Sequence, residues 1–556
     1  MDQANPAGCN AMTVQTPFSG IQALIIDDMA AQQSTLRGHL SLLGIAKADV
    51  ATNPDDATRL IKSRRYGLIL CDYNLNQKTD GQQLFEYLRD NELLPADCLF
   101  FMITAESSYA SVAAATEHHP DAYLLKPATA ADIGDRLKAQ LEKRAALARI
   151  TDKLKRDDLV GALEACDNLM SVQNRWFVQA MQIKGQTLLK LSKNDEAKAL
   201  YRSAVEKRPE LIWAQLGLAK AHKALGQYDE AKRLAQKIIE SPEGEKNVAA
   251  YDVLAESIEA QGDPQAAMWV LKDVATIVPS ARRQRIAGES AYRNGDLETA
   301  KTLLTKANKS TKGSVIAQAQ DTLLLAQTLV DMGEPAEALK HLQEAAPSYK
   351  TSAAFGMVSL AIQAQAEVKA GKPEEAEKTL ERARATLRKG KADFASMALA
   401  KAELMAGNEE KGLSILNSVV SADHENARIK QMVSNTLTST GHADKIHDVV
   451  VGRAAILEGQ VQDARKLLRN SQIDDAVAAI ETAVDTYPEN TGVLLQATQI
   501  NCMALRLKKE YNAQMIERVQ QYLIRLETLM PGNDRVGKMR RYFRETKSDL
   551  EAPVSL

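Results

Sequence analysis

Four short apolar runs, each ending in polar residues, set the strongest limit on how the first 140 residues can fold. They are Ala23 to Ile26 before Asp27 and Asp28, Gly67 to Cys71 before Asp72, Phe100 to Ile103 before Thr104, and Ala122 to Leu125 before Lys126. Such runs are typical of buried strands, and helical stretches separate them. Alternating strands and helices predict a parallel sheet, whose ligands gather outside the carboxyl ends of the strands. We therefore expect the polar residues to meet at one edge.

The residue types at that edge predict an acidic site beside a cation. Asp27, Asp28 and Asp72 repel one another, and hard oxygen ligands with open water positions suit Mg²⁺. Lys126 and the hydroxyl group of Thr104 add a second cation and a donor for an anionic oxygen. This set predicts phosphoryl transfer with an aspartate as the nucleophile. Alone, a strand-ending aspartate indicates a helix cap and a Lys-Pro pair indicates a turn.

In this order the residues resemble the receiver (CheY-like) domain of two-component response regulators, over residues 20 to 140. The resemblance implies a doubly wound α/β fold with a five-stranded parallel sheet. It implies that Asp72 is the phosphoacceptor. It also implies that Asp27, Asp28 and Asp72 hold Mg²⁺ together with the backbone carbonyl group of Asn74.

The resemblance assigns three further residues and meets two departures. It implies that Thr104 and Lys126 contact the phosphoryl group, and that Tyr123 is the family's aromatic switch residue. The position four residues after the phosphoacceptor, commonly proline, is Asn76, and the residue after Lys-Pro is Ala128 rather than a bulky one. An alanine-rich helix is expected at residues 109–117. Neither departure touches the chemistry of the site.

Beyond residue 150 the strand signals end and one spacing recurs. A glycine lies five residues before a small or apolar residue seven times, and the second members are 36, 33, 38, 38, 36 and 34 residues apart. The pairs are Gly226/Ala231, Gly262/Ala267, Gly295/Ala300, Gly333/Ala338, Gly371/Ala376, Gly407/Gly412 and Gly441/Ile446. Glycine can end a helix in the left-handed conformation, and a small residue lets the next helix pack closely. The spacing predicts antiparallel helix pairs that stack into a solenoid.

These units resemble tetratricopeptide repeats, whose period is about 34 residues. The best match is Met181 to Pro209, with Gly185, Ala197 and Tyr201 at family positions. We predict a receiver domain at 20–140, a helical linker at 141–157 and a solenoid of eight or nine units at 158–548. A disordered extension at 1–19 and a tail at 549–556 complete the division. The linker either carries motion between the domains or simply connects them, and the basic stretch from Lys538 to Arg544 is expected to cap the solenoid.

Composition excludes several functions. Basic and acidic side chains number 70 and 72, so no DNA partner is expected, because a nucleic acid needs a basic face. Five scattered cysteines and no apolar run of membrane-spanning length predict a cytoplasmic protein without disulfides, zinc cluster or membrane insertion, and the resemblance to two-component regulators implies a bacterial one. No Gly-Lys-Ser/Thr phosphate loop or His-Glu-x-x-His helix is present, so the output is expected to be binding and not enzymatic. The three tryptophans, Trp176, Trp213 and Trp269, are expected to pack in the core.

The leading hypothesis is a phosphorylation-controlled signalling adaptor. A sensor histidine kinase would donate the phosphoryl group to Asp72, and the receiver would then regulate the binding of a protein partner by the repeats. The resemblance to receiver-repeat regulators adds restraint of another phosphorelay, and it leaves room for a dimer formed through the receiver. Two alternatives stay open. One is a constitutive repeat scaffold on which the receiver is a docking domain, and the other is a repeat array that binds nucleic acid.

Overall fold

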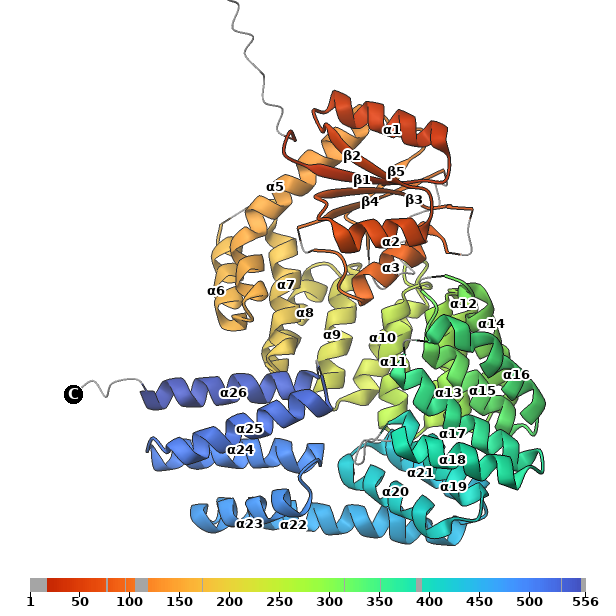
Figure 1. Cartoon of the computed structure of the whole chain (residues 1–556). Coiled ribbons are helices and arrows are strands. Elements are labelled where there is room, and N and C mark those ends of the chain that lie inside the picture. The colour runs from red at the N-terminus through yellow and green to blue at the C-terminus, as the bar shows by residue number, and fades with distance from the viewer. Residues whose placement is uncertain are drawn as a thin grey trace, which may run out of the picture.

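The computed structural model describes residues 18–551 except 77–78, 96, 106–118, 173, 315, 351, 387–392 and 532. Figure 1 shows an α/β domain at the N-terminal end and a long helical array that curls beneath it. The predicted extension at 1–19 and tail at 549–556 lie largely outside the described residues. The helix expected at 109–117 lies wholly outside them.

The α/β domain is built on five parallel strands in the order β2-β1-β3-β4-β5. Its elements are β1 (Gln22–Ile26), α1 (Ala30–Leu42), β2 (Lys47–Ala51), α2 (Pro54–Ser63), β3 (Leu68–Asp72), α3 (Gly81–Asp90), β4 (Leu99–Thr104), β5 (Ala122–Leu125) and α5 (Ala130–Lys155). Each of the four predicted strands forms within a residue or two of its expected place. The predicted doubly wound fold is confirmed.

Two apolar layers cover the two faces of this sheet. Helices α1 and α5 bury one face, where Leu40 and Leu137 pack against Ile25 and Phe101. Helices α2 and α3 bury the other, with Phe85 of α3 against the strands. Strands buried on both faces read as continuous apolar runs, which is why β1, β3 and β4 stood out in the sequence. The described helices of both layers follow the carboxyl ends of the strands that precede them.

Local capping positions the two helices that flank this end of the sheet. Asp80 accepts a hydrogen bond from the backbone N–H of Gln83, whose side chain in turn accepts one from the backbone of Asp80, so α3 begins at Gly81. Thr129 and Asp132 form the same reciprocal arrangement at the start of α5. Each arrangement satisfies two backbone donors that a bare helix end leaves unpaired.

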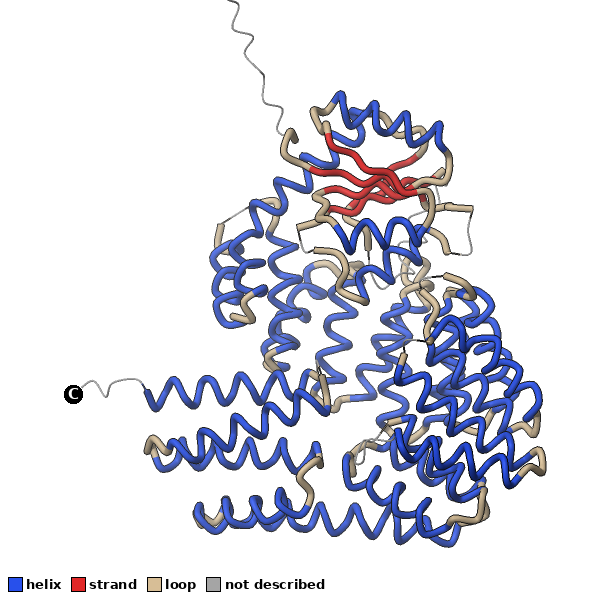
Figure 2. The backbone as a smooth tube through the Cα atoms, in the orientation of Figure 1, coloured by secondary structure: helices blue, strands red, loops and turns tan. Residues whose placement is uncertain are grey.

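The rest of the described chain is helical (Figure 2). The α-helices are α6 (Leu159–Met170), α7 (Phe177–Lys190), α8 (Asn194–Lys207), α9 (Ile212–Ala224), α10 (Tyr228–Ile239), α11 (Val248–Ala260), α12 (Pro264–Ile277), α13 (Ala281–Arg293), α14 (Leu297–Thr311), α15 (Ala319–Asp331), α16 (Pro335–Ala345), α17 (Ala353–Lys369), α18 (Pro373–Thr386), α19 (Phe394–Met405), α20 (Glu409–Ala422), α21 (Ala427–Ser439), α22 (Arg453–Arg469), α23 (Ile473–Thr486), α24 (Thr491–Lys508), α25 (Ala513–Leu529) and α26 (Asp534–Glu551). Three short helices, η1 (Ala346–Tyr349), η2 (Ala443–Lys445) and η3 (His447–Gly452), interrupt them. Consecutive helices contact each other as stacked pairs. None of the helices in the described ranges has the length and apolar character that a membrane span requires.

The turns between paired helices explain the recurring glycine. All seven predicted glycines have positive φ, from 72° at Gly371 to 90° at Gly262. Six of the seven partners lie at the start of the next helix and are buried, as with Ala231 and Ala300, which have no exposed surface, whereas Ile446 is half-buried between η2 and η3. An L-residue rarely adopts such a φ, and a larger side chain would separate the helices. The predicted role of this spacing is confirmed.

Three further turns of the same kind carry no glycine. Asp157, Ser192 and Ser471 have φ values of 55°, 57° and 62°. Each lies five residues before a buried alanine, and the pair Ser471 and Ala476 belongs to a unit in which the sequence shows no glycine. The turn geometry therefore extends to units that the glycine pattern misses.

The array closes back on its own beginning. Arg541 of α26 donates a hydrogen bond to the backbone oxygen of Lys190 at 2.8 Å and lies 3.8 Å from a carboxylate oxygen of Asp157. Halfway along, Arg428 of α21 forms a two-point ion pair with Glu259 of α11. The basic C-terminal helix, expected only to cap the solenoid, thus also joins its two ends (Figure 1).

Two features of the junction and the array bear on the predictions. Helix α5 runs unbroken from the sheet to Lys155 and packs against α6. The division into a receiver ending at 140 and a linker ending at 157 stays a prediction.

The tryptophans of the array differ in their surroundings. Trp213 packs on the core of the first units beside Tyr201. Trp269 is 47% exposed, with the Lys272 ammonium group 4.5 Å from the centre of its ring. Core packing is therefore wrong for Trp269.

Candidate functional site

The carboxyl ends of β1 and β3 bring three carboxylates together. Asp27 directly follows β1, Asp72 ends β3, and the two strands pair with Ile26 opposite Cys71. One oxygen each from Asp27, Asp28 and Asp72 lies within 4.8 Å of the others. The alignment of two neighbouring strands, together with the adjacent Asp28, is enough to build the cluster that the sequence predicted.

Burial makes it unfavourable for all three carboxylates of this cluster to be charged at once. Asp27 is 1% exposed and Asp72 is 5% exposed. Burial raises the pKa of Asp27, and the charges of Asp72 and Asp28 raise it further, while a hydrogen bond from the backbone N–H of Met29 and the charge of Lys126 oppose the shift. That N–H lies 2.8 Å from Asp27 Oδ1. A buried cluster of this kind gains stability from any cation that enters it.

One cation is supplied by the chain itself. The ammonium nitrogen of Lys126, which follows β5, lies 2.7 Å from Asp72 Oδ2. Thr104 ends β4, the strand beside β3, and is 4% exposed. Its backbone oxygen accepts a hydrogen bond from the N–H of Lys126 at 2.8 Å, and this bond holds the start of the Lys126-Pro127 turn against β4. The structure thus brings Asp27, Asp28, Asp72, Thr104 and Lys126 to one edge.

The donor set fits a divalent metal ion. Asp28 Oδ2 accepts a hydrogen bond from the Asn76 amide at 2.7 Å, whereas Asp28 Oδ1 is buried and has no hydrogen-bond partner among the described residues. A buried carboxylate oxygen without a donor is unfavourable unless a cation approaches it. Three carboxylates with oxygens this close match the hard ligands that Mg²⁺ prefers.

The remaining predicted residues lie around this cluster. Asn74 follows β3 in the loop to α3, and its backbone N–H is 3.4 Å from Asp72 Oδ1. Tyr123 on β5 is half-buried on the α2 and α3 side of the sheet, with its hydroxyl oxygen 3.5 Å from Gln82 Oε1. Tyr123 therefore points toward α3 in this structure.

Two residues that shape the site were not predicted to do so. Asn76 has φ 46° and reaches back to Asp28, so the residue that replaces the expected proline makes a bond that proline cannot make. Gly81 has no room for a side chain, because a Cβ atom there would lie 2.1 Å from the backbone oxygen of Asp72. The sequence signal for Gly81 was its position directly after the helix-capping Asp80. Asn76 offered only the departure from the family pattern.

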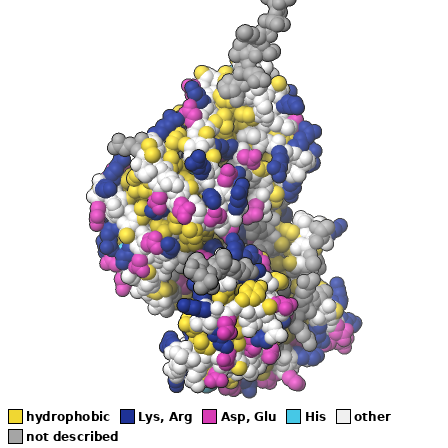
Figure 3. Space-filling model, turned by 90° about the vertical axis from the view of Figure 1, so that its left-hand side faces the viewer, with side chains coloured by type: hydrophobic (Ala, Val, Ile, Leu, Met, Phe, Trp, Pro, Cys, Tyr) yellow, Lys and Arg dark blue, Asp and Glu magenta, His cyan; other side chains and the backbone are white. Residues whose placement is uncertain are grey.

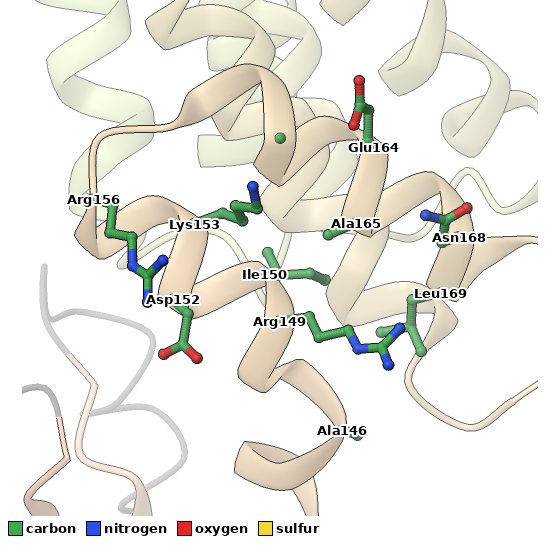
Figure 4. A pocket seen from close by; sticks show the side chains of 11 residues that line it. Ala146, Arg149, Ile150, Asp152, Lys153, Arg156, Glu164, Ala165, Asn168 and Leu169 are labelled. Atoms are coloured by element: carbon green, nitrogen blue, oxygen red, sulfur yellow. The ribbon is translucent and has the colours of Figure 1, made fainter.

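Cavities elsewhere on the described surface do not indicate a particular ligand. A cavity of about 600 Å³ lies between α5 and α6, where Arg149, Lys153 and Glu164 surround an apolar floor that includes Ile150 (Figure 4). Another, of about 440 Å³, lies between α13, α15, α19 and α21. On the side of the molecule that carries α6, basic and acidic side chains alternate with hydrophobic ones (Figure 3). Mixed charge of this kind does not select one class of ligand.

Comparison with known proteins agrees with this architecture. A family model described as response regulator receiver domain matches residues 23–138, and one described as tetratricopeptide repeat matches residues 188–256. Neither describes an enzymatic output domain.

Several solved structures match this chain at low identity and low TM-score. A tetratricopeptide repeat protein from Parabacteroides merdae is 15% identical, with 53% of this chain and 98% of that chain covered and a TM-score of 0.30. A structure of Naa15/Naa10 bound to HypK-THB is 13% identical, with 75% and 69% covered and a TM-score of 0.28. The APC/C hetero-tetramer Cut9-Hcn1 is 10% identical, with 73% and 90% covered and a TM-score of 0.24. Similarity at this level carries no argument about function. The sheet order, the acidic cluster and the two family models together show that the chain consists of an N-terminal response regulator receiver domain followed by tetratricopeptide repeats.

Proposed function

We propose that this protein is a phosphorylation-controlled signalling adaptor whose receiver accepts a phosphoryl group on Asp72 from a histidine kinase. One observation carries the proposal. Three carboxylates converge at the end of the sheet, Lys126 contacts Asp72, and Asp28 Oδ1 has no hydrogen-bond partner among the described residues. This is the arrangement that receives a metal ion and an anionic group together.

Each residue has a separate part in the transfer. A carboxylate oxygen of Asp72 attacks the phosphorus atom, and the bond from phosphorus to the imidazole nitrogen of the kinase breaks as the new bond forms. Lys126, already 2.7 Å from Asp72, turns its ammonium group to the incoming oxygens. The Thr104 hydroxyl group donates to another of these oxygens. A magnesium ion held by Asp27, Asp28, Asp72 and the Asn74 carbonyl group would neutralise the charge that gathers there.

The repeats are proposed to bind a protein partner. Stacked helix pairs form grooves that recognise extended or helical segments. The partner that we favour is a component of a second phosphorelay, which the repeats would restrain. In the alternative, a constitutive scaffold, the receiver serves only as a docking domain. The packing of α5 against α6 is compatible with both.

A phosphorylation assay on the full chain separates these two functions. Acetyl phosphate and Mg²⁺ are added to the protein, and the phosphorylated form is resolved by electrophoresis in a phosphate-retarding gel. We expect a retarded, phosphorylated band for the wild type and none for Asp72→Asn. Asp135→Asn, which alters an exposed carboxylate on α5, is the matched control and should be phosphorylated normally. Absence of the retarded band for the wild type would rule out the phosphorylation-controlled adaptor and favour the constitutive scaffold. A partner captured equally by wild type and Asp72→Asn in the presence of donor rejects regulation through the receiver.

A further inference from the structure

The receiver contacts the repeats through the loop before α3 and through α3 itself. The Thr79 hydroxyl oxygen lies 2.5 Å from the Ser314 hydroxyl oxygen in the turn between α14 and α15. Asp90, the last residue of α3, accepts a hydrogen bond from Arg282 of α13 at 2.8 Å. Thr79 is 2% exposed although it lies in a loop. Figure 1 shows α2 and α3 on the side of the sheet that faces the array.

The matching surface on the repeats is an arginine pair at an unusual place. Arg282 and Arg283 lie in the first turn of α13, which contains no acidic residue. Cations are disfavoured at this end because the helix dipole is positive there. Arg283 is 3% exposed and pairs with Asp252 of α11, and burial lowers its pKa to about 10 while the charge of Glu86 on α3 opposes that shift. Glu86 and Asp90 on α3 therefore offset the positive charges of Arg282 and Arg283, which are unfavourable at the start of α13.

The contact is polar and incompletely packed. The side chains of Arg282 and Asp90 keep 39% and 35% of their surfaces exposed. A cavity of about 730 Å³ remains beside Ser314, lined by α14, α15, α16 and Asp55 of α2. Ion pairs this exposed contribute little, and interfaces of this composition open readily. A contact of this kind is sensitive to a change in charge or in loop geometry.

The loop that makes the contact is also tied to the acidic cluster. Asn76 donates to Asp28 Oδ2 at 2.7 Å, and Thr79 lies three residues further along the loop. The other end is held where the N–H of Gly81 donates to the oxygen of Tyr73 at 2.8 Å. A phosphoryl group brings about two negative charges to the cluster. That charge competes with Asn76 for the surroundings of Asp28, and Thr79, only three positions further in the sequence, is the residue that contacts Ser314.

We propose that Thr79, Glu86 and Asp90 on the receiver and Arg282, Arg283 and Ser314 on the repeats form a latch, which is closed in the unphosphorylated protein and opens when Asp72 is phosphorylated. The proposal rests on the proposed function for its trigger. Closure of the latch does not depend on that trigger and is tested separately.

Disulfide trapping measures the closed latch directly. Thr79→Cys and Ser314→Cys place two thiols where the two hydroxyl oxygens now lie 2.5 Å apart. Cys9→Ser removes the native cysteine outside the described residues, and Cys71, Cys98, Cys166 and Cys502 are buried. We expect the full chain to cross-link in oxidised glutathione. The cross-linking rate should fall at least tenfold when Mg²⁺ and beryllofluoride are added as a phosphoryl mimic.

A charge swap supplies the second variant. In the cross-linking background, Arg282→Glu should slow the reaction by about two- to fivefold, the scale of one exposed ion pair, and adding Asp90→Arg should restore it. The matched control pair is Asn308→Cys with Thr322→Cys, which joins α14 to α15 within the repeats. Its rate should not respond to the mimic or to the charge swap.

The outcomes distinguish the latch from its trigger. Binding of beryllofluoride is followed independently by ¹⁹F NMR. Failure of Thr79→Cys/Ser314→Cys to cross-link without the mimic, or failure of the swap to restore the rate, overturns the closed latch. An unchanged rate with the mimic bound overturns its opening by phosphorylation. Absence of beryllofluoride binding overturns the proposed function and the trigger together, while the charge swap still decides whether the latch closes.

Discussion

Replacing Lys126 by methionine tests whether the acidic cluster depends on the ammonium group that contacts Asp72. Methionine keeps most of the length of the side chain and removes its charge. Three carboxylates within 4.8 Å of one another then lose the ammonium group that lies 2.7 Å from Asp72. We expect the receiver to be destabilised in the absence of divalent metal and to recover when Mg²⁺ is added.

The magnitude follows from these distances. At an effective dielectric constant of about 20, two unit charges at 4.8 Å interact by about 3.5 kcal/mol and a pair at 2.7 Å by about 6 kcal/mol. Desolvation of the ammonium group offsets much of this, and removing one partner of a buried ion pair costs about 3–5 kcal/mol. Because 23% of the Lys126 side chain is exposed, we expect a loss of about 2–4 kcal/mol. Protonation of Asp27, whose pKa is already raised, sets an upper limit on the loss.

Native-state hydrogen exchange of peptides from β1 and β3 is the suitable assay. Tryptophan fluorescence does not report on the receiver, since Trp176, Trp213 and Trp269 all lie in the repeats. Saturating Mg²⁺ stabilises a folded site by about 2.7 kcal/mol at one hundred times its dissociation constant. It should therefore restore most of what Lys126→Met loses.

Lys138→Met, an exposed lysine on α5, is the control and should change stability by less than about 0.5 kcal/mol. A loss below about 1 kcal/mol for Lys126→Met would refute the reasoning, given the 3–5 kcal/mol expected for breaking a buried pair. So would a loss that is the same with and without Mg²⁺.

Three other substitutions test separate features. Gly81→Ala places a methyl group 2.1 Å from the Asp72 backbone oxygen, so the loop must move; we expect a loss of about 2 kcal/mol or more and weakened Mg²⁺ binding by calorimetry, and normal binding would contradict the close approach. Burial lowers the pKa of His424 below its usual 6.5, so the stability that it contributes is present above pH 6.5 and is lost as the pH falls toward its folded value. His424→Gln should therefore reduce the dependence of unfolding free energy on pH below 6.5 by up to about 1.4 kcal/mol per pH unit, measured by urea unfolding followed by circular dichroism. An unchanged pH dependence would show that His424 does not contribute to it. Ser471→Gly relieves a φ of 62° and should stabilise the C-terminal repeats by about 0.5–1 kcal/mol, whereas a destabilised variant would show that the serine side chain contributes more than its strain.

Much of the site could be predicted because it depends on neighbours along each strand. The order of polar residues after β1, β3, β4 and β5 places them at one edge of any parallel sheet. Strand β2 was not identified from its residues, because it is an edge strand with only Ala51 fully buried and lacks a continuous apolar run. The bond from Asn76 to Asp28 could not be foreseen, since it joins residues 48 positions apart through an unusual φ.

The helix pairs of the array likewise follow from local sequence, because a left-handed turn and a small residue five positions later are needed wherever two helices fold back tightly. Closure of the array through Arg541 and the contact of Thr79 with Ser314 join residues 351 and 235 positions apart. They depend on the summed rotation of many stacked pairs and on where a continuous α5 places the receiver. No single segment of the sequence contains that geometry, so only the folded chain decides which surfaces meet.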